Sequence, residues 1–309
     1  MSTKKEKWTS DNIPNLDGKV IIVTGGNSGL GFETVKLFAQ KGAEVVLACR
    51  SVEKGEAAKS TIGKIKGQIT VMKLDLASLE NVKEFVNQFK AKYERLDILF
   101  NNAGIMTTPY GLTEDGLEQQ QGVNHFGHFA LTAQLFGLLK ATKGSRVVNT
   151  SSTGHKFGKM DFNNLLYENG KEYTPMNAYR RSKLENLLFT YEMQRRIEKE
   201  GLDIKVLAAH PGTARTEIGR YAEKELWFKL FKPLIMLATH HNAYGGALPQ
   251  VRAGIDANAK GGEYFGPDGY MEQKGNPVVV KSNKASHNEQ DAKQLWIESE
   301  KLTGVTFDI

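Results

Sequence analysis

The 309-residue sequence has little cysteine, no long apolar run and no dense charge of either sign. Its one cysteine, Cys49, excludes a disulfide within the chain and leaves no zinc-binding pattern. This cysteine usage fits a reducing compartment, and we expect a cytoplasmic protein. The first ten residues have no apolar stretch after their positive charges, so we expect no signal peptide. No apolar segment has the length of a membrane span, so we expect none.

Charge is modest and scattered along the chain. The formal net charge is +6 and the pI is about 9.1, yet no basic stripe interleaved with aromatic residues is present. We therefore expect no nucleic-acid partner, whereas a mildly basic protein suits a small anionic cofactor. His125, His128 and His155 are not spaced with carboxylates as metal ligands are, and His240-His241 is an isolated pair. We predict no metal site.

Short apolar segments alternate with helical segments from residue 20 to residue 209. Fully apolar short strands separated by helices are typical of a parallel sheet that is covered on both faces. Right-handed crossovers then give an α/β fold with a doubly wound parallel sheet, the Rossmann fold. Without a repeat or a linker, we predict an N-terminal arm over residues 1–18 and a single domain over 19–309. The expected strands are 20–24, 45–48, 70–74, 98–100, 146–149 and 205–209, and the expected helices are 33–41, 52–62, 79–93, 116–139 and 177–200.

The first expected strand runs into a glycine-rich loop, Thr-Gly-Gly-Asn-Ser-Gly-Leu-Gly, which ends at residue 31. Gly25, Gly29 and Gly31 would let backbone N–H groups and a helix N-terminus approach a pyrophosphate closely. Asn27 and Ser28 can add side-chain hydrogen bonds. The alternative is a plain tight turn. We prefer the phosphate loop because open α/β sheets bind ligands where the first strand ends.

The second expected strand ends in a basic residue. It reads Ala-Cys-Arg, and no acidic residue follows Arg50 until Glu53. An acidic residue there would accept from a ribose 2′-hydroxyl, whereas Arg50 could clamp a 2′-phosphate, assisted by Lys54 one turn on. We therefore predict NADP(H) in preference to NAD(H), with a surface arginine as the alternative. Asp75, after the third strand, either accepts from the adenine amine or caps the next helix.

Tyr179 and Lys183 are four residues apart in Asn-Ala-Tyr-Arg-Arg-Ser-Lys, so a helix would place both on one face. There an ammonium group could lower the pKa of a phenol and let it donate or accept a proton near neutral pH. The same Tyr/Lys spacing occurs after Tyr167 and after Tyr270, but both lie in turn-forming sequence. Only Tyr179 opens a long helix of apolar period.

Four motifs in this order resemble the short-chain dehydrogenase/reductase family over about residues 18–212. They are the glycine loop, Asn-Asn-Ala-Gly, Asn-Thr-Ser-Ser and Tyr-x-x-x-Lys, and His-Pro-Gly-Thr follows them. Each motif is weak alone, whereas the ordered set is specific. The segment Gly-Val-Asn-His-Phe-Gly-His-Phe and the long stretch before Tyr179 resemble the retinol-dehydrogenase-like branch. The motifs occupy Thr24–Gly31, Asn101–Gly104, Asn149–Ser152, Tyr179–Lys183 and His210–Thr213.

The resemblance implies a role for each motif. Tyr179 would be the general acid/base, Lys183 would hold the nicotinamide ribose and lower the Tyr179 pKa, and Ser152 would hydrogen-bond the substrate oxygen. Asn124 would hold a water that relays protons from Lys183, and a structural hydrogen bond within a helix is the alternative. Ser151 competes with Ser152, because a continuing strand points them to opposite faces; the family pattern favours the second. The residues implied to bind the cofactor are Gly25, Asn27, Ser28, Gly29, Leu30, Gly31, Arg50, Lys54, Asp75, Leu76, Asn102, Ala103, Gly104, Tyr179, Lys183, Pro211, Gly212 and Thr213.

We therefore predict an NADP(H)-dependent oxidoreductase that acts on an apolar alcohol/carbonyl substrate. The alternatives are a dinucleotide-bound regulatory protein without turnover and a reductase of an activated carbon–carbon double bond. Residues 153–176 lengthen the usual gap between serine and tyrosine and should form a loop over or beside the site. We expect a substrate lid at about 213–260, in which 226–237 is a lid, an interface or a membrane-surface helix. The resemblance also implies a homodimer or homotetramer.

Overall fold

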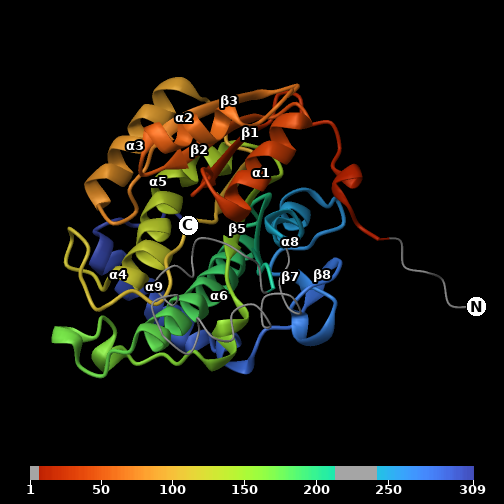
Figure 1. Ribbon diagram of the computed structural model, residues 1–309. Helices are drawn as coiled ribbons and strands as arrows, with labels where there is room; N and C mark the ends of the chain where they lie inside the picture. The colour runs from red at the N-terminus through yellow and green to blue at the C-terminus, as the bar shows by residue number, and fades with distance from the viewer. Residues whose placement is uncertain (1–6, 213–241) are drawn as a thin grey trace, which may run out of the picture.

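The computed structural model describes residues 7–212 and 242–309 and is built on a twisted central sheet (Figure 1). Within these residues eight strands follow the order β3-β2-β1-β4-β5-β6-β7-β8. Neighbouring strands are parallel as far as β7, and β8 is antiparallel to β7. The last two strands were not predicted from the sequence. The strands are β1 (Val20–Thr24), β2 (Glu44–Cys49), β3 (Gln68–Lys73), β4 (Ile98–Asn101), β5 (Ser145–Thr150), β6 (Ile204–Ala209), β7 (Tyr264–Pro267) and β8 (Pro277–Val280).

Helices cover both faces of the sheet, which confirms the doubly wound α/β fold and the single domain. Ile22 and Val147 pack with α3, α5 and α6 on one face, whereas Ile21 and Val148 pack with α1 and α8 on the other. Successive strand residues point to opposite faces, so a sheet buried on both sides needs apolar residues at every position. The helices are α1 (Gly29–Gln40), α2 (Val52–Ser60), α3 (Leu79–Lys92), α4 (Gln119–Gln121), α5 (Gly127–Ala141), α6 (Pro175–Lys199), α8 (Ala243–Ile255) and α9 (Glu289–Thr303).

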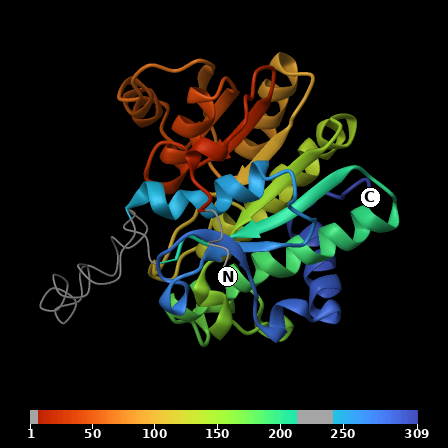
Figure 2. The same cartoon turned by 90° about the vertical axis from the view of Figure 1, so that its right-hand side faces the viewer.

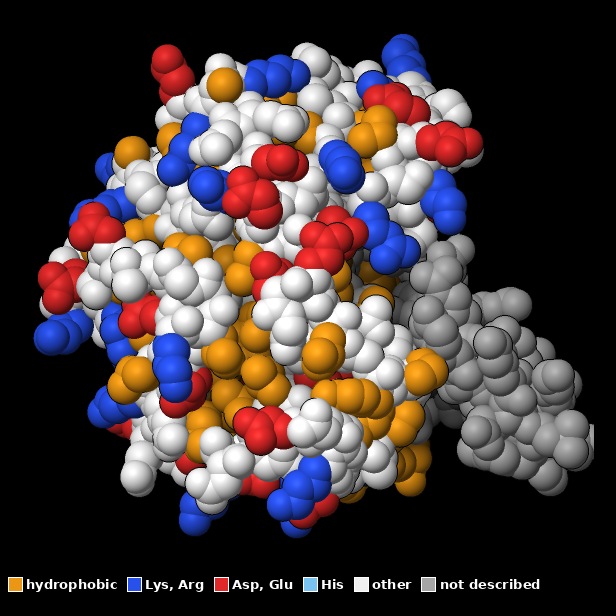
Figure 3. Space-filling view, turned by 90° about the vertical axis from the view of Figure 1, so that its left-hand side faces the viewer, with side chains coloured by type: hydrophobic (Ala, Val, Ile, Leu, Met, Phe, Trp, Pro, Cys, Tyr) orange, Lys and Arg blue, Asp and Glu red, His pale blue; other side chains and the backbone are white. Residues whose placement is uncertain are grey.

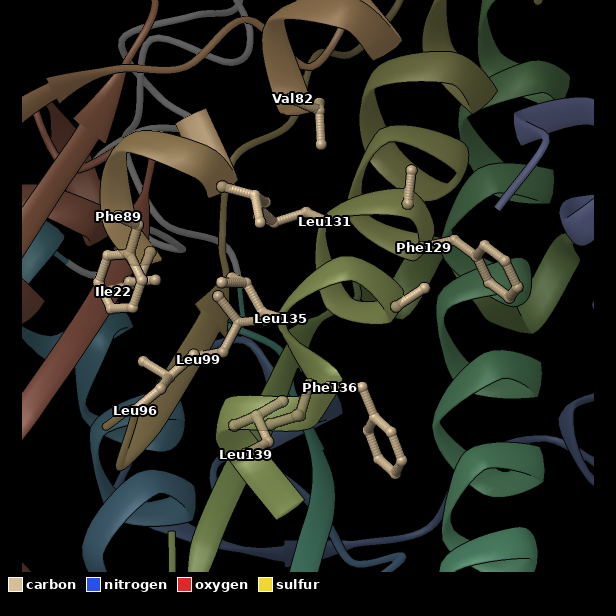
Figure 4. Packing of buried hydrophobic residues seen from close by; sticks show 14 of the residues in the cluster. Ile22, Val82, Phe89, Leu96, Leu99, Phe129, Leu131, Leu135, Phe136 and Leu139 are labelled. Carbon is tan, nitrogen blue, oxygen red and sulfur yellow. The ribbon is translucent and has the colours of Figure 1, made fainter. Parts of the chain in front are cut away.

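The α5 helix lies at the centre of the larger hydrophobic cluster. Figure 4 shows Leu135 of α5 beside Leu99 of β4, and Phe129 pointing toward the neighbouring helix. The Phe129 ring lies 5.4 Å from the ring of Phe189 on α6. Each such buried Leu or Phe side chain contributes about 1.5–3 kcal/mol to stability. This packing fixes α6 relative to the strand ends.

The long helix expected over 116–139 starts later and is interrupted. Gly116 has φ +77 in a turn, and the helix begins after Glu118, whose carboxylate accepts from the N–H groups of Gln120 and Gln121. Residues Gly122–Phe126 then form a π-helical turn before α5. Such turns are often found at functional sites, because they redirect a few side chains within an otherwise regular helix.

The described part of the N-terminal arm belongs to the domain core. Ile13 and Leu16 are buried in the cluster that includes α1 and α8. The Tyr244 hydroxyl of α8 donates to the hydroxyl of Ser10 at 2.8 Å. The prediction of an arm separate from the domain is therefore wrong for residues 10–16, because their apolar side chains are needed to close the core beneath α8.

The outer sides of α5 and α6 are covered by α9 and the C-terminal tail. Figure 2 shows α9 in blue beside α6 in green. The Trp296 ring lies 5.4 Å from Phe129 and 4.6 Å from Phe307. Any pairing of two copies through α5 and α6 would have to accommodate α9. The homodimer or homotetramer stays a prediction.

The expected lid divides into two parts. Residues 213–241, which include Thr213 and the 226–237 stretch, lie outside the described residues. The remainder forms α8 and the turn after it, and Ala247 and Val251 of α8 are fully buried against the sheet. The prediction of a lid is therefore wrong for residues 243–255, because their apolar side chains are part of the core.

The surface carries mixed charge. On the face shown in Figure 3, Lys and Arg side chains are interspersed with Asp and Glu, and hydrophobic side chains gather toward the middle of the face. Across residues 7–212 and 242–309, no helix combines the length and the apolar character that crossing a membrane requires.

Candidate active site

The glycine loop joins β1 to α1 in a conformation that requires its glycines. Gly25 and Gly29 have φ values of +65° and +53°, in the left-handed region. A Cβ on Gly31 would lie 2.3 Å from the carbonyl oxygen of Gly25, so no side chain fits there. The first turn of α1 lines the adjoining cavity, where free N–H groups and the helix dipole favour an anion.

A cavity of about 310 Å³ lies beside this loop, at the carboxyl ends of β1, β2 and β4. This is where open α/β sheets bind their ligands, and the volume is within the range of small-molecule sites. The structure brings together every residue between 25 and 104 that the sequence implied for the cofactor. They are Gly25, Asn27, Ser28, Gly29, Leu30, Gly31, Arg50, Lys54, Asp75, Leu76, Asn102, Ala103 and Gly104.

Arg50 and Lys54 stand at one end of this cavity. Arg50 directly follows β2 and is exposed, and Lys54 lies in the first turn of α2. Ser51 between them caps α2 by accepting from the Lys54 N–H at 3.2 Å. This cap turns the chain so that both cations line the same cavity. The pair therefore offers positive charge to an anionic group beyond the ribose.

Asp75 also lines the cavity, but it does not cap α3. Ser78 is the cap and accepts from the Asn81 N–H, whereas the Asp75 carboxylate accepts from the Ala77 N–H at 3.0 Å. The capping alternative for Asp75 is therefore wrong. Its backbone N–H donates to the Asn81 side chain at 2.6 Å, which fixes the turn after β3.

Asn102 joins the ends of β1 and β4. The side-chain NH₂ group of Asn102 donates to the Thr24 carbonyl at 2.7 Å. The side-chain oxygen of Asn102 accepts from the Gln250 amide at 3.1 Å. Gln250, buried on α8, also donates to the Thr34 hydroxyl and accepts from the Thr150 hydroxyl. Gln250 thus ties the cofactor loop to the end of β5. Sequence reasoning missed it, because its partners lie at least 100 residues away.

Tyr179 and Lys183 lie on one face of α6, in its second and third turns. Thr174 caps the helix by accepting from the Asn177 N–H, and Pro175 occupies the first turn, so Tyr179 enters a formed helix. The Lys183 ammonium donates to the Thr150 carbonyl at 3.0 Å and lies 5.9 Å from the centre of the Tyr179 ring. Burial lowers the pKa of Lys183 from 10.5 to about 8.

The other two Tyr/Lys pairs are in turns, as predicted. The segment after Tyr167 is a three-residue 3₁₀ turn, and Tyr270 opens another. Neither places its tyrosine and lysine on one helical face. Of the three pairs, only the one in α6 has the geometry that the chemistry needs.

The phenol of Tyr179 is protonated at neutral pH in this arrangement. Burial raises the pKa of Tyr179 above its ordinary value of 10, and a hydrogen bond with Ser152 opposes this shift. We expected Lys183 to lower this pKa. The Lys183 ammonium donates to the Thr150 carbonyl, and its effect on the Tyr179 pKa stays a prediction.

The two serines after β5 have different partners. The Ser151 hydroxyl is buried and donates to the Lys183 carbonyl at 2.7 Å, so it holds α6 in place. The Ser152 hydroxyl accepts from the Gly154 N–H at 3.1 Å. A Cβ on Gly154 would lie 3.4 Å from the Tyr179 ring, which shows how closely this turn approaches the phenol. The second serine is the one placed beside the tyrosine.

Asn124 lies in the π-helical turn between the cavity and Lys183. Its side chain accepts from the Ile105 N–H at 2.8 Å and donates to the Ile105 carbonyl and the Ser182 hydroxyl. A Cβ on Gly104 would lie 3.1 Å from the Asn124 amide oxygen and 3.4 Å from the Lys183 ammonium. Gly104 therefore connects the cofactor cavity to the catalytic helix.

The structural alternative for Asn124 fits its side chain. All three of these side-chain contacts fasten the chain after β4 to α6. Its backbone carbonyl accepts from His128, whose other ring nitrogen meets the Thr24 hydroxyl at 2.9 Å. Burial lowers the pKa of His128 to about 4, so this bridge is neutral. The water-holding role of Asn124 stays a prediction.

The His-Pro-Gly segment follows β6 on the far side of Tyr179. His210 is buried, and its Nδ1 accepts from the Gly212 N–H at 3.2 Å. Pro211 and Gly212 are partly buried, and Thr213 lies outside the described residues. In the part of the chain that the structure describes, no three His, Cys, Asp or Glu side chains are grouped as metal ligands.

Residues 153–176 lie beside the site, as expected. They form short 3₁₀ turns, and the Tyr173 hydroxyl donates to the Thr108 carbonyl at 2.8 Å, where Thr108 lines the cavity. Gln120 binds both sides of this contact, donating to the Tyr173 hydroxyl and accepting from the Thr107 N–H. This insertion therefore supports the loop that forms one wall of the cavity.

Known proteins share both the sequence and the fold. The family described as short chain dehydrogenase matches residues 19–227. Retinol dehydrogenase 11 of Mus musculus is 47% identical over 214 residues, which cover 69% of this chain and 66% of that protein. Retinol dehydrogenase 13 of Homo sapiens is 38% identical over 304 residues, which cover 94% of this chain and 86% of that protein.

A solved structure agrees with these relatives over almost the whole chain. The crystal structure of an uncharacterized protein from Mycobacterium paratuberculosis is 36% identical, with a TM-score of 0.82, and covers 98% of this chain and 100% of that one. The matched regions include the glycine loop, the Tyr-x-x-x-Lys helix and the strands between them. The chain therefore belongs to the short-chain dehydrogenase/reductase family of nicotinamide-dependent oxidoreductases, in its retinol-dehydrogenase-like branch.

Proposed function

We propose that this protein is an NADP(H)-dependent oxidoreductase that interconverts an apolar carbonyl compound and its alcohol. One observation carries the proposal: a Cβ on Gly154 would lie 3.4 Å from the Tyr179 ring and 3.5 Å from the Ser152 hydroxyl, so the two side chains lie together, and Lys183 of the same helix reaches Gly104 in the cavity wall. A bound nicotinamide would supply or accept the hydride. The protein must then deliver a proton to the developing alkoxide and stabilise its charge.

Each residue of the proposed site has a task that suits its surroundings. Tyr179, with its raised pKa, holds the proton that the alkoxide needs. Ser152 offers a hydroxyl to the same oxygen. Lys183 would hold the nicotinamide ribose, since its ammonium is buried next to Gly104 at the edge of the cavity. In the reverse direction, Tyr179 would have to lose its proton before it could accept the proton of the alcohol.

The proposed preference for NADP(H) rests on Arg50 and Lys54. Both line the cavity at the end of β2, where an acidic residue would be needed to favour the free 2′-hydroxyl. We expect Arg50→Asp to lower kcat/KM for NADPH about tenfold or more, and to change NADH much less, because a charge-assisted clamp on the phosphate is lost. Steady-state kinetics with both cofactors measures this. An unchanged NADPH preference would show that another group binds the phosphate.

The apolar nature of the substrate is proposed from two observations. Ile105 and Met106 line the cavity next to Gly104, and relatives covering most of this chain are named retinol dehydrogenases. An apolar wall beside the reacting oxygen excludes water and favours a bulky hydrocarbon substrate. We also propose a cytoplasmic location, in keeping with the single buried thiol of Cys49.

The experiment is NADPH consumption with carbonyl compounds graded in size and polarity, together with identification of each product. We expect activity that rises with apolar size and yields alcohols. Saturated ketones formed from enones would instead indicate reduction of a carbon–carbon double bond. NADPH binding without turnover of any compound in the series would favour a regulatory protein and contradict the proposal.

A further inference from the structure

The turn between β7 and β8 holds two residues in an unusual backbone conformation. Met271 and Glu272 have φ values of +50° and +57°, although neither is glycine. For such residues the left-handed region costs about 1–2 kcal/mol each, and it persists only where the surroundings hold it. In this protein the strained turn is held by contacts with the two segments that flank Tyr179.

The Glu272 carboxylate contacts two basic side chains, which come from different segments of the chain. The same oxygen lies 3.2 Å from Nε2 of His210 and 3.1 Å from the ammonium of Lys156. His210 is completely buried, whereas Glu272 and Lys156 are 25% and 37% exposed. The contact with His210, and then the one with Lys156, lower the pKa of Glu272 to about 2, so the carboxylate is ionised at any working pH.

His210 transmits this contact to the His-Pro-Gly turn. Because its Nδ1 accepts from the Gly212 N–H, the ring proton is on Nε2, which faces Glu272. Burial lowers the pKa of His210, in keeping with a neutral ring. The contact between the two turns is close: a Cβ on Gly212, which has φ +69, would lie 2.2 Å from the Gln273 carbonyl oxygen.

Lys156 connects Glu272 to the opposite side of the site. It lies in the 3₁₀ turn Thr153–Phe157, which is capped by Ser152. The same turn approaches Tyr179, because a Cβ on Gly154 would lie 3.4 Å from the Tyr179 ring. The contacts of Glu272 therefore reach the Pro211-Gly212 turn through His210 and the Ser152 turn through Lys156.

We propose that Glu272 is a positioning residue for the reaction, which holds these two turns at a fixed separation around Tyr179. The inference rests on the proposed function for its consequence in catalysis. The orientation of the His210 ring, which is the structural part of the inference, does not depend on the proposed function. The strained turn is the means by which the carboxylate reaches both partners, since the positive φ of Glu272 directs it back over Gly212.

Three variants test the proposal. Glu272→Leu removes the carboxylate that contacts both His210 and Lys156, and should lower kcat about tenfold or more and weaken NADPH binding, because both turns are released. Glu272→Gln keeps an oxygen that accepts from Nε2 and should restore kcat to within about fivefold of the wild type. Lys156→Met releases only the Ser152 turn and should lower kcat while leaving the NADPH dissociation constant unchanged. Glu289→Gln on α9, whose exposed carboxylate also meets a lysine, is the matched control.

Nitrogen NMR of the His210 ring gives a readout that does not depend on turnover. The Nε2–H form should be present in the wild type and in Glu272→Gln, and the ring should exchange between forms in Glu272→Leu. If Glu272→Leu does not fold, Glu272→Gln and Lys156→Met decide the matter by the same readouts. Wild-type kcat, NADPH affinity and ring spectrum in Glu272→Leu would overturn the proposal. Absence of turnover in the wild type itself would overturn the proposed function, while the ring spectrum and NADPH affinity would still test Glu272.

Discussion

The two sides of helix α6 bury ionisable groups for opposite purposes. Tyr179 and Lys183 face the end of β5 and the turn after it, whereas Arg181 and Glu185, two residues further on in each case, face away from them. All four are buried. The comparison shows that burial of a charged side chain does not by itself identify a catalytic residue.

On the outer side the charges are bound by the inserted segment. The Arg181 guanidinium donates to the carbonyl oxygens of Lys159, Asn164 and Leu165 and lies 4.1 Å from the centre of the Tyr167 ring. A guanidinium with this many acceptors has little capacity left for a ligand. Arg181 thus fastens residues 159–167 to the helix.

On the side that faces β5, Lys183 makes fewer contacts with the described residues than Arg181 does. Of its three N–H donors, the Lys183 ammonium directs one to the Thr150 carbonyl. Its pKa falls to about 8 because burial is not offset by a carboxylate. The difference between the two sides teaches that the reactive cation is the one whose partners are incomplete, because a substrate or cofactor can then complete them.

Replacement of Lys183 should give the largest effect on turnover. We expect Lys183→Met to lower kcat about a hundredfold or more and to weaken NADPH binding, with a small change in the free energy of unfolding. The methionine fits the same space without a charge to desolvate. Steady-state kinetics and urea unfolding measure the two quantities. Retained turnover in Lys183→Met would contradict the comparison, because Lys183 would then matter no more for the reaction than Arg181 does.

Replacement of Arg181 should show the reverse pattern. Arg181→Met removes the charged donor of three carbonyl groups, and we expect the free energy of unfolding to fall by about 2 kcal/mol. The loss of turnover at low temperature should be far smaller than for Lys183→Met. Arg180→Met, at the next and less buried position, is the control. A variant as stable as the wild type would contradict the anchoring role.

Replacement of Glu185 should give the smallest effect of the three. This effect is on the free energy of unfolding, and it should depend on pH. Burial raises its pKa from 4.5 to about 8, and one carboxylate oxygen accepts from Gln121 at 2.6 Å. Between pH 4.5 and 8, the folded protein therefore keeps a proton on Glu185 that the unfolded chain releases. The contribution of Glu185 to stability is full below pH 4.5 and is lost as pH rises toward 8. Glu185→Gln removes the penalty. We expect it to stabilise the protein by more than about 1 kcal/mol at pH 8.5 and hardly at all at pH 4.5.

Urea unfolding at the two pH values measures this difference, with Glu289→Gln as an exposed control. The prediction would be falsified if Glu185→Gln changed stability equally at both pH values. That result would mean that Glu185 is ionised in the folded protein.

The sequence predicted best what is encoded locally. The glycine loop, the Arg50 turn and the Tyr179/Lys183 spacing each depend on residues within a few positions of one another, and strands β1 to β6 follow from short apolar runs. All of these were found, with boundaries shifted by a few residues. The order of the motifs then fixed the family.

What the sequence did not predict depends on contacts between distant segments. Gln250 meets Thr34 and Asn102, and Glu272 meets Lys156, across more than 100 residues each. β8 ends the sheet antiparallel, which no crossover pattern indicates. The helical spacing of Tyr179 and Lys183 also gives the face on which Lys183 lies but not the partner of its ammonium, which is the Thr150 carbonyl.

The most direct test of the account is the turnover of Tyr179→Phe measured beside its NADPH affinity. Removal of the hydroxyl leaves the ring packing in place and takes away the proton donor. The account predicts that kcat falls about a hundredfold or more while the NADPH dissociation constant stays within a few-fold of the wild type. A variant that consumes NADPH at the wild-type rate would contradict the central claim that this phenol supplies the proton.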